Sequence, residues 1–326
     1  MAEIRCHTVP QFYLNYFLEN GSSLFWVYDK KVIESRPQTP INTTVIGDYY
    51  LSSPDKDGKR DARMESFLAA IEGMAKPILD SWRANPSQLN DEGKSIIAMF
   101  LSFIHSRVPR AVEVIKEMNM TGLEHVMDEM KKFSKDPIKL KKHYEKFRTS
   151  EEGKNCNVSL EQFERMMSNP REFGEPGINE KYAMGESFNT AQLVYSCLIN
   201  MTWSICAVQN KRFFVIGDAP MVVFAQTDKH KAIFGAGFGL PNVEIAFPLS
   251  PKLCLWMDKR KSARYRIVGA DFVEEVNRRS IHMAERFVIS PYKSNRIQNV
   301  VKEFAAHYGK PKIDAKAIKE RWFQVE

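Results

Sequence analysis

The spacing of apolar residues changes twice along the chain. Up to about residue 60, short β-type runs such as SSLFWVYD (22–29) and KKVIES (30–35) are separated by turn residues. From Asp61 to about residue 202, apolar residues recur three and four positions apart, which predicts amphipathic helices. After about residue 203 short strand-like runs return, and a helical spacing follows them toward the C-terminus.

The order of these segments predicts an α+β fold. The first two runs are expected to pair as an N-terminal β-hairpin, ahead of a helical subregion over about 61–202 and a β-rich subregion over about 203–270. Because the later strands follow one another without alternating helices, their sheet is expected to be mostly antiparallel and packed with the C-terminal helices. No internal repeat divides the chain, so residues 1–326 are predicted to form a single compact domain.

Local signals predict where three helices begin or break. Thr8 is a candidate cap for a short helix over PQFYLNYF, with Pro10 in its first turn. Ser159 and Gln162 have the spacing of a capping box. Pro77 is expected to kink or break the helix that begins near residue 61.

The longest apolar stretch, AQLVYSCLINMTWSICAV at 191–208, approaches the length of a membrane span. Polar residues interrupt it at Gln192, Asn200 and Thr202. We therefore predict a buried helix followed by a strand, and no membrane association.

Composition and charge narrow the class of protein. Of the 326 residues 44% are hydrophobic and 27% are charged, which is typical of a globular chain with a sizeable core. The formal charge of +7 favours anionic partners such as nucleic acid. The five cysteines include no C-x-x-C pair, which argues against a zinc site or a disulfide framework and favours reduced thiols in the cytoplasm.

A series of short motifs occurs in a characteristic order along nearly the whole chain. They are His7-x-x-Pro10-x-Phe12-Tyr13-Leu14, Tyr28-Asp29, Glu65 with Glu72, Arg107-x-Pro109, Asp218-x-Pro220, FPLSP at 247–251, and Val276-Asn277. In this set the chain resembles the mainly bacterial and fungal family known as domain of unknown function 4238. The resemblance implies a shared fold but no established activity. Members usually carry a hydroxyl residue before the aspartate of Asp-x-Pro, where this chain has Gly217.

His7 is the first candidate for chemistry. It precedes the predicted helix start, so its backbone is expected to be held in place. An imidazole there can act as a general acid or base, bind a metal ion or respond to pH. The alternative is a packing role, in which one ring nitrogen bonds a buried acceptor and the ring contacts Phe12 or Phe17.

Glu65 and Glu72 are the second candidates. Seven residues make two helical turns, so both carboxylates lie on nearly the same side of one helix, about 10 Å apart along its axis. Asp61 would widen this acidic patch by one more turn. An inward carboxylate must be paired or metal-bound, whereas the alternative is that both glutamates are solvated or form ordinary ion pairs.

Arg107 and Asp218 complete the candidate set. Arg107 ends an apolar helix, where a guanidinium can hold a carboxylate or phosphate, or simply bridge one of the two glutamates. Asp218 ends the strand RFFVIG next to Pro220, a position suited to a metal ligand or base but also to an ordinary turn residue.

Two other segments invite a phosphate-binding interpretation. GAGFGLP (235–241) lacks the spacing of a phosphate-binding loop and precedes a strand, so a glycine turn is expected. KKFSKDPIKLKKHYEKF (131–147) mixes lysines with Phe133, Tyr144 and Phe147, a composition that suits either a phosphate backbone or a solvated helical face.

Two functions fit these residues. In the first, His7, Glu65, Glu72, Arg107 and Asp218 converge in one cleft of a hydrolase acting on an anionic substrate such as a phosphodiester, with Glu65 and Asp218 binding Mg²⁺ or Mn²⁺. A bacterial defence or toxin role is consistent with such a nuclease-like activity. In the second, the same residues form a structural network inside a nucleic-acid or protein-binding module. An open site with spare hydrogen-bonding capacity would favour the first function, and a sealed, fully paired set the second.

Overall fold

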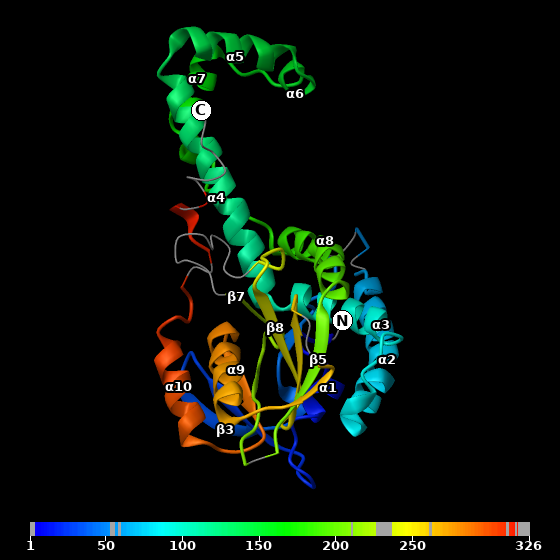
Figure 1. Cartoon of the computed structure of the whole chain (residues 1–326). Coiled ribbons are helices and arrows are strands. Elements are labelled where there is room, and N and C mark those ends of the chain that lie inside the picture. Colours follow the sequence, from blue (N-terminus) through cyan, green and yellow to red (C-terminus); the bar gives the residue numbers. More distant parts are fainter. Residues whose placement is uncertain are drawn as a thin grey trace.

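The fold is α+β, as predicted (Figure 1). It is taken from a computed structural model that describes residues 4–52, 56–57, 60–209, 211–225, 237–260, 263–310, 313–316 and 318. The helices are α1 Gln11–Asn15, α2 Arg63–Ala84, α3 Lys94–Arg107, α4 Pro109–Ser134, α5 Pro137–Thr149, α6 Glu151–Lys154, α7 Leu160–Ser168, α8 Glu180–Ile199, α9 Ala270–Met283 and α10 Asn295–Ala305, with short 3-10 turns at Pro40–Asn42, Pro86–Gln88 and Pro170–Phe173. The strands are β1 Arg5–His7, β2 Phe25–Asp29, β3 Glu34–Gln38, β4 Val45–Gly47, β5 Thr202–Ala207, β6 Ile216–Gly217, β7 Val222–Ala225, β8 Val243–Ser250, β9 Leu253–Asp258, β10 Tyr265–Ile267 and β11 Phe287–Ser290.

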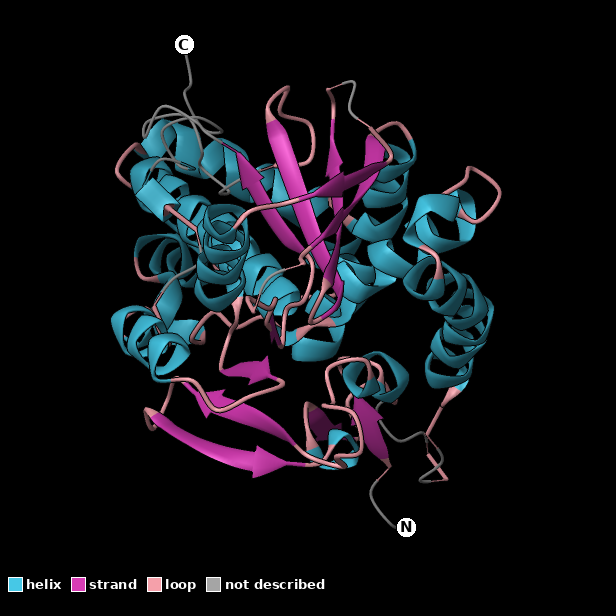
Figure 2. Ribbon diagram, turned by 60° about the horizontal axis from the view of Figure 1, so that its bottom comes forward, coloured by secondary structure: helices cyan, strands magenta, loops and turns pink. Residues whose placement is uncertain are grey.

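The described strands form three sheets. The largest has the order β10-β5-β9-β8-β7, the second has the order β3-β2-β11-β6, and β1 pairs with β4 alone. Every pairing is antiparallel except that of β10 with β5, so the prediction of a mostly antiparallel sheet is confirmed. Figure 2 shows the two larger sheets as separate groups of strands with helices around them.

The predicted N-terminal hairpin is confirmed, but its place in the fold was not foreseen. β2 pairs with β3 in the register that joins Asp29 to Glu34. β11 then pairs along the other edge of β2 and carries β6 on its far side. The helical spacing that begins at Asp271 predicts a helix through Ile289, but the structure ends α9 at Met283 and forms β11 from Phe287.

The N-terminal aromatic run is fixed in the main core. Tyr13 stacks on Phe247 with ring centroids 4.7 Å apart, and its hydroxyl donates a 2.6 Å hydrogen bond to the carbonyl of Pro248. Phe17 is also fully buried in this core. The helix start differs from the prediction, because the Thr8 hydroxyl bonds the Thr44 carbonyl and does not cap α1.

α2 continues through Pro77, so the predicted break does not occur. A proline inside a helix costs about 3 kcal/mol because one backbone hydrogen bond is lost. Residues on both sides of Pro77, including Ile71, Ala75, Leu79 and Trp82, are buried in the main core. Burial of one apolar face along the whole helix offsets the cost of the proline.

An arm extends from the body of the molecule. α4 begins near α8 and runs outward, and α5, α6 and α7 lie at its far end (Figure 1). The predicted capping box at the start of α7 is confirmed, with Ser159 and Gln162 each bonding the other's backbone N–H. Nothing in the hydrophobic spacing distinguished this arm from the helices of the body.

The stretch 191–208 divides between α8 and β5, as predicted. Among the residues that the structure describes, no helix is both long enough and apolar enough to cross a membrane.

Candidate functional site

Four of the five predicted site residues form one cluster, which we call the N-terminal polar cluster and define as His7, Glu65, Glu72 and Arg107. They come from three elements far apart in the sequence, namely β1, α2 and α3. Charge interactions connect Glu65 to Glu72 and Arg107, and connect His7 to the same two residues.

Arg107 joins these elements. α3 ends at Arg107 because Val108, which precedes Pro109, is held in an extended conformation. The side chain is only 2% exposed, and its Nε donates a 3.0 Å hydrogen bond to the Thr8 carbonyl. Its Nη1 forms a 2.7 Å ion pair with Glu72 Oε1. Its buried Nη2 has no hydrogen-bond partner within the described chain.

Glu65 lies in the first turn of α2, two turns before Glu72, as the spacing predicted. Burial raises the pKa of Glu65, the charge of Glu72 raises it further, and the charge of Arg107 and a hydrogen bond with Cys6 oppose the increase. One carboxylate oxygen, Oε2, is buried and accepts no hydrogen bond from the described residues. Glu65 therefore holds a proton at a higher pH than an ordinary glutamate does.

His7 is the last residue of β1, where it pairs with Val45 of β4. Burial lowers the pKa of His7, while a hydrogen bond with the Thr43 backbone and the charge of Glu72 act in the opposite direction. Its Nδ1 is buried and has no hydrogen-bond partner among the described residues. The Tyr50 hydroxyl donates a 3.4 Å hydrogen bond to the His7 carbonyl. The lowered pKa favours the neutral imidazole, which lies at a fixed strand end shortly before α1.

The cluster keeps unused hydrogen-bonding capacity. His7 Nδ1, Glu65 Oε2 and Arg107 Nη2 are all buried side-chain atoms without a partner in the described structure. Buried polar groups are nearly always paired, and exceptions indicate a bound water, an ion or a functional role. A neutral imidazole, a carboxyl group with a raised pKa and a guanidinium nitrogen together supply a base, an acid and a cation.

Asp218 does not share the surroundings of the cluster. Its carboxylate accepts hydrogen bonds from the backbone N–H groups of Glu285 (2.7 Å), Arg286 (2.9 Å) and Phe287 (2.9 Å). Burial raises its pKa, and these three bonds oppose the increase. Asp218 therefore holds the turn between α9 and β11. No printed contact among the described residues links Asp218 to the other four predicted site residues.

Gly217 is explained by a close approach of α9. A Cβ atom at Gly217 would lie 2.7 Å from Ala284 Cβ and 3.2 Å from the Ser280 carbonyl oxygen. No hydroxyl-bearing side chain fits there without a shift of this helix end. The absence of a side chain at Gly217 therefore allows the end of α9 to pack closely against this position.

The residues expected to bind Mg²⁺ or Mn²⁺ do not come together. Glu65 interacts with Cys6 and the two other charged cluster residues, whereas Asp218 is bonded at the start of β11. Over the described ranges, no group of three or more His, Cys, Asp and Glu side chains is arranged to hold a metal ion. The donor set thus does not fit the predicted metal site.

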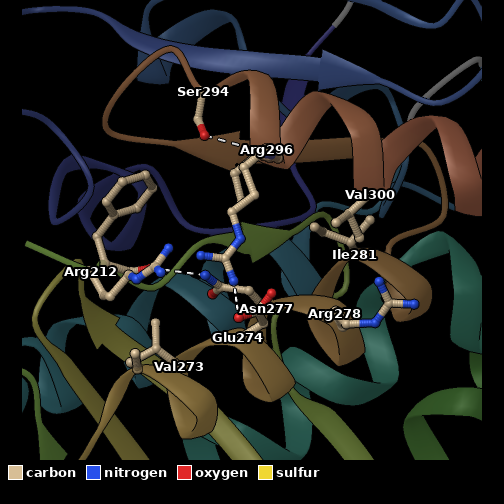
Figure 3. A pocket seen from close by; sticks show the side chains of 12 residues that line it. Arg212, Val273, Glu274, Asn277, Arg278, Ile281, Ser294, Arg296 and Val300 are labelled. Atoms are coloured by element: carbon tan, nitrogen blue, oxygen red, sulfur yellow. Dashed lines mark hydrogen bonds and ion pairs between the residues drawn. The ribbon is translucent and has the colours of Figure 1, made fainter.

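A pocket of about 70 Å³ between α9 and α10 is bordered by arginines (Figure 3). Arg296 forms an ion pair with Glu274. Arg278 bonds Glu303, with Nη1 3.0 Å from Oε2. Because these two guanidinium groups are paired, this small pocket offers little attraction to an anion.

Two polar residues that the sequence analysis did not single out lie beside the cluster. His105 and Arg110 flank Arg107 along the chain and line a mostly apolar cavity. Their signal in the sequence was a histidine and an arginine on either side of a helix junction, which is too common a pattern to indicate a site.

Comparison with known proteins gives one match. A family model described as "Protein of unknown function (DUF4238)" matches residues 5–294, a range that contains the whole N-terminal polar cluster and Asp218. No curated protein and no solved structure matches the chain.

Proposed function

The chain belongs to the DUF4238 family of proteins of unknown function, and on that premise we propose that it is a hydrolase acting on an anionic substrate such as a phosphodiester. The N-terminal polar cluster would be its catalytic site. The observation that carries this proposal is the set of three buried, unbonded atoms, namely His7 Nδ1, Glu65 Oε2 and Arg107 Nη2. A purely structural network would be expected to use this hydrogen-bonding capacity internally.

The shifted pKa values of His7 and Glu65 support a role for each of these two residues. His7 is held neutral and can accept a proton, whereas Glu65 retains a proton more readily than usual and can donate one. In the proposed reaction Arg107 Nη2 binds a phosphate oxygen, His7 takes a proton from the attacking water, and Glu65 protonates the leaving oxygen. One P–O bond forms as another breaks, and exchange with solvent then restores both protonation states.

Glu72 would act by positioning Arg107. Its 2.7 Å ion pair occupies Nη1, so that Nη2 is the terminal nitrogen left for substrate. No step is assigned to Mg²⁺ or Mn²⁺, because the described residues provide no cluster of ligands for them. A dependence on these ions is nevertheless tested in the experiment below.

The test is cleavage of RNA, single-stranded DNA and duplex DNA by the purified chain, with EDTA, Mg²⁺ or Mn²⁺ in parallel. We expect cleavage of at least one substrate, and its loss in His7→Ala and in Glu65→Gln. Glu92→Gln, a change of the same type at an exposed position outside the cluster, should retain activity. Folding of each variant is checked by thermal denaturation. Absence of cleavage under all conditions, or full activity of both cluster variants, would overturn the proposal.

A second candidate function is nucleic-acid binding by the arm. It is favoured by the exposed basic side chains of α5, which are Lys139, Lys141, Lys142, Lys146 and Arg148, carried outward at the end of α4 (Figure 1). Binding of this kind weakens steeply as salt concentration rises.

Two aromatic residues of the arm, Tyr144 and Phe147, are engaged within it and do not offer free rings to stack on bases. Phe147 stacks on Phe163, with ring centroids 5.4 Å apart, and the Tyr144 hydroxyl bonds the Val158 carbonyl. Replacement of Lys139, Lys142 and Lys146 by glutamine should abolish binding to RNA and DNA without affecting the N-terminal polar cluster. Unchanged binding would remove this candidate.

The proposal includes a cytoplasmic location. All five cysteines are free, which is the state expected in a reducing compartment.

A further inference from the structure

A cavity of about 480 Å³ is bordered by residues of the α3–α4 junction, on either side of Arg107 in the sequence. Its walls come from the end of α3, the first three turns of α4, one side of α8, and the segment that leads into β7. The volume falls within the range of roughly 300–1,000 Å³ that is typical of small-molecule sites.

Most of the wall is apolar. Val114 and Met118 of α4 face Leu193 of α8 across it, and Leu193 is 70% exposed. Val114 and Met118 also pack against Ile313 and Ile318. Such a wall suits a hydrocarbon chain, since each methylene group removed from water contributes about 0.8 kcal/mol.

Arg110 is the one cation among the described residues that line this cavity. Burial lowers its pKa, and the charges of Glu285, Asp218 and Glu117 oppose that decrease. Within the described chain Arg110 forms no hydrogen bond or ion pair. Asp218 is committed to three backbone N–H groups, and Glu117 accepts the N–H of Ile313 at 3.1 Å. The guanidinium group of Arg110 is therefore largely removed from water, while its N–H groups donate no hydrogen bond to the described residues.

His105 lies next to Arg110 in the wall without adding charge. Its ring meets Phe238 edge-on, with centroids 5.0 Å apart, and no described residue forms a hydrogen bond with it. Burial, with a smaller contribution from the charge of Arg110, lowers the pKa of His105 to about 4. The site thus presents one positive charge and one neutral polar ring above an apolar chamber.

We propose that this cavity binds an amphipathic carboxylate, with its head group on Arg110 and its hydrocarbon chain along the walls of α4 and α8. A carboxylate matches a single guanidinium through two parallel hydrogen bonds. A doubly charged phosphate head is disfavoured, because three acidic side chains act on Arg110 and only one cation is available to the ligand. This site is independent of the hydrolase proposed above.

The first test is calorimetric titration of the whole chain with dodecanoate, using dodecanol and dodecyl phosphate as head-group controls. We expect dodecanoate to bind more tightly than both. Arg110→Gln should weaken dodecanoate binding about tenfold or more, because a hydrogen bond to a charged group is lost, and should leave dodecanol unaffected. Lys131→Gln, which removes an exposed cation from the far end of the same helix, should bind like the wild type.

The second test needs no substitution. Cys197 lines the cavity, whereas Cys156 is exposed near the end of the arm. Bound dodecanoate should slow alkylation of Cys197 and leave the alkylation rate of Cys156 unchanged. The proposal is overturned if dodecanoate does not bind, if Arg110→Gln binds it as tightly as the wild type, or if Cys197 is not protected at saturating ligand.

Discussion

Arg107 and Glu72 form a 2.7 Å ion pair that joins the last residue of α3 to the middle of α2. The same guanidinium bonds the Thr8 carbonyl and leaves Nη2 without a described partner. One side chain therefore fixes the N-terminal segment against two helices and also offers a buried donor to a ligand. Arg107 therefore contributes both to the stability of the fold and to the proposed activity, and variants can distinguish these two contributions.

Removal of the Arg107 side chain should destabilise the protein. Arg107→Ala leaves the Thr8 carbonyl and the half-buried Glu72 carboxylate without their partner, which costs about 3 kcal/mol in free energy of unfolding. Arg63→Ala, which removes a 92% exposed side chain paired with Asp61, should leave stability nearly unchanged. Urea denaturation measures both. Equal stability of the two variants would show that the Arg107 contacts do not hold the fold.

Glu65 should reduce stability at neutral pH. The pKa of Glu65 is raised in the folded protein, so the folded state favours the protonated carboxyl group. The resulting contribution to the free energy of unfolding is fully present below the unfolded pKa near 4.5, and it is lost as the pH rises through the folded pKa. At pH 7 to 8, Glu65→Gln should therefore unfold at a higher temperature than the wild type while losing the proposed hydrolase activity. A lower melting temperature for this variant would mean that the Glu65 charge supports the fold.

His105 should make the protein sensitive to acid. Its folded-state pKa is lowered to about 4, so the unfolded chain binds a proton first, and stability is lost as pH falls below the unfolded value near 6.5. Between pH 6.5 and 4 this loss reaches about 3 kcal/mol, at 1.36 kcal/mol per pKa unit. His105→Gln should remove that part of the pH dependence. His143→Gln, at an exposed position, should keep the wild-type profile, and the same profile for His105→Gln would contradict the assignment.

Asp218 should be a structural residue. Asp218→Ala leaves three backbone N–H groups at the start of β11 without their acceptor, which costs several kcal/mol. Any activity should fall only in proportion to the unfolded fraction, which circular dichroism measures in the assay buffer. A folded variant without activity would instead place Asp218 at the catalytic site.

Gly217 should tolerate no hydroxyl residue. Gly217→Ser brings a Cβ within 2.7 Å of Ala284 Cβ, and such overpacking costs about 1–3 kcal/mol. The double variant with Ala284→Gly should recover part of this loss, because the closest contact is removed. A double-mutant cycle on melting temperatures measures the coupling, and purely additive effects would contradict the packing explanation.

Some of the chemistry was readable from local spacing. Glu65 and Glu72 lie on one side of α2 because seven residues make two turns, and Ser159 with Gln162 form the capping box that their spacing predicted. In contrast, Pro77 lies inside a continuous helix, because burial against residues distant in the sequence outweighs the local preference.

Other features depended on contacts that no local pattern encodes. The second sheet places β11 between β2 and β6, which joins the N-terminal hairpin to segments that begin only at Ile216. His7 and Asp218 both looked like fixed polar residues at element ends. Both carboxylate oxygens of Asp218 accept backbone N–H groups at the start of β11, whereas His7 Nδ1 has no hydrogen-bond partner among the described residues.

The sequence by itself determined the α+β class, most helices and strands, and the acidic side of α2, because these follow from periodicity over one or two turns. Only the tertiary structure decided that His7, Glu65, Glu72 and Arg107 meet, that Asp218 does not join them, and that Arg110 borders an apolar cavity. Which side chains meet depends on how separate elements pack, and whether a polar atom is paired depends on backbone groups brought there by the fold.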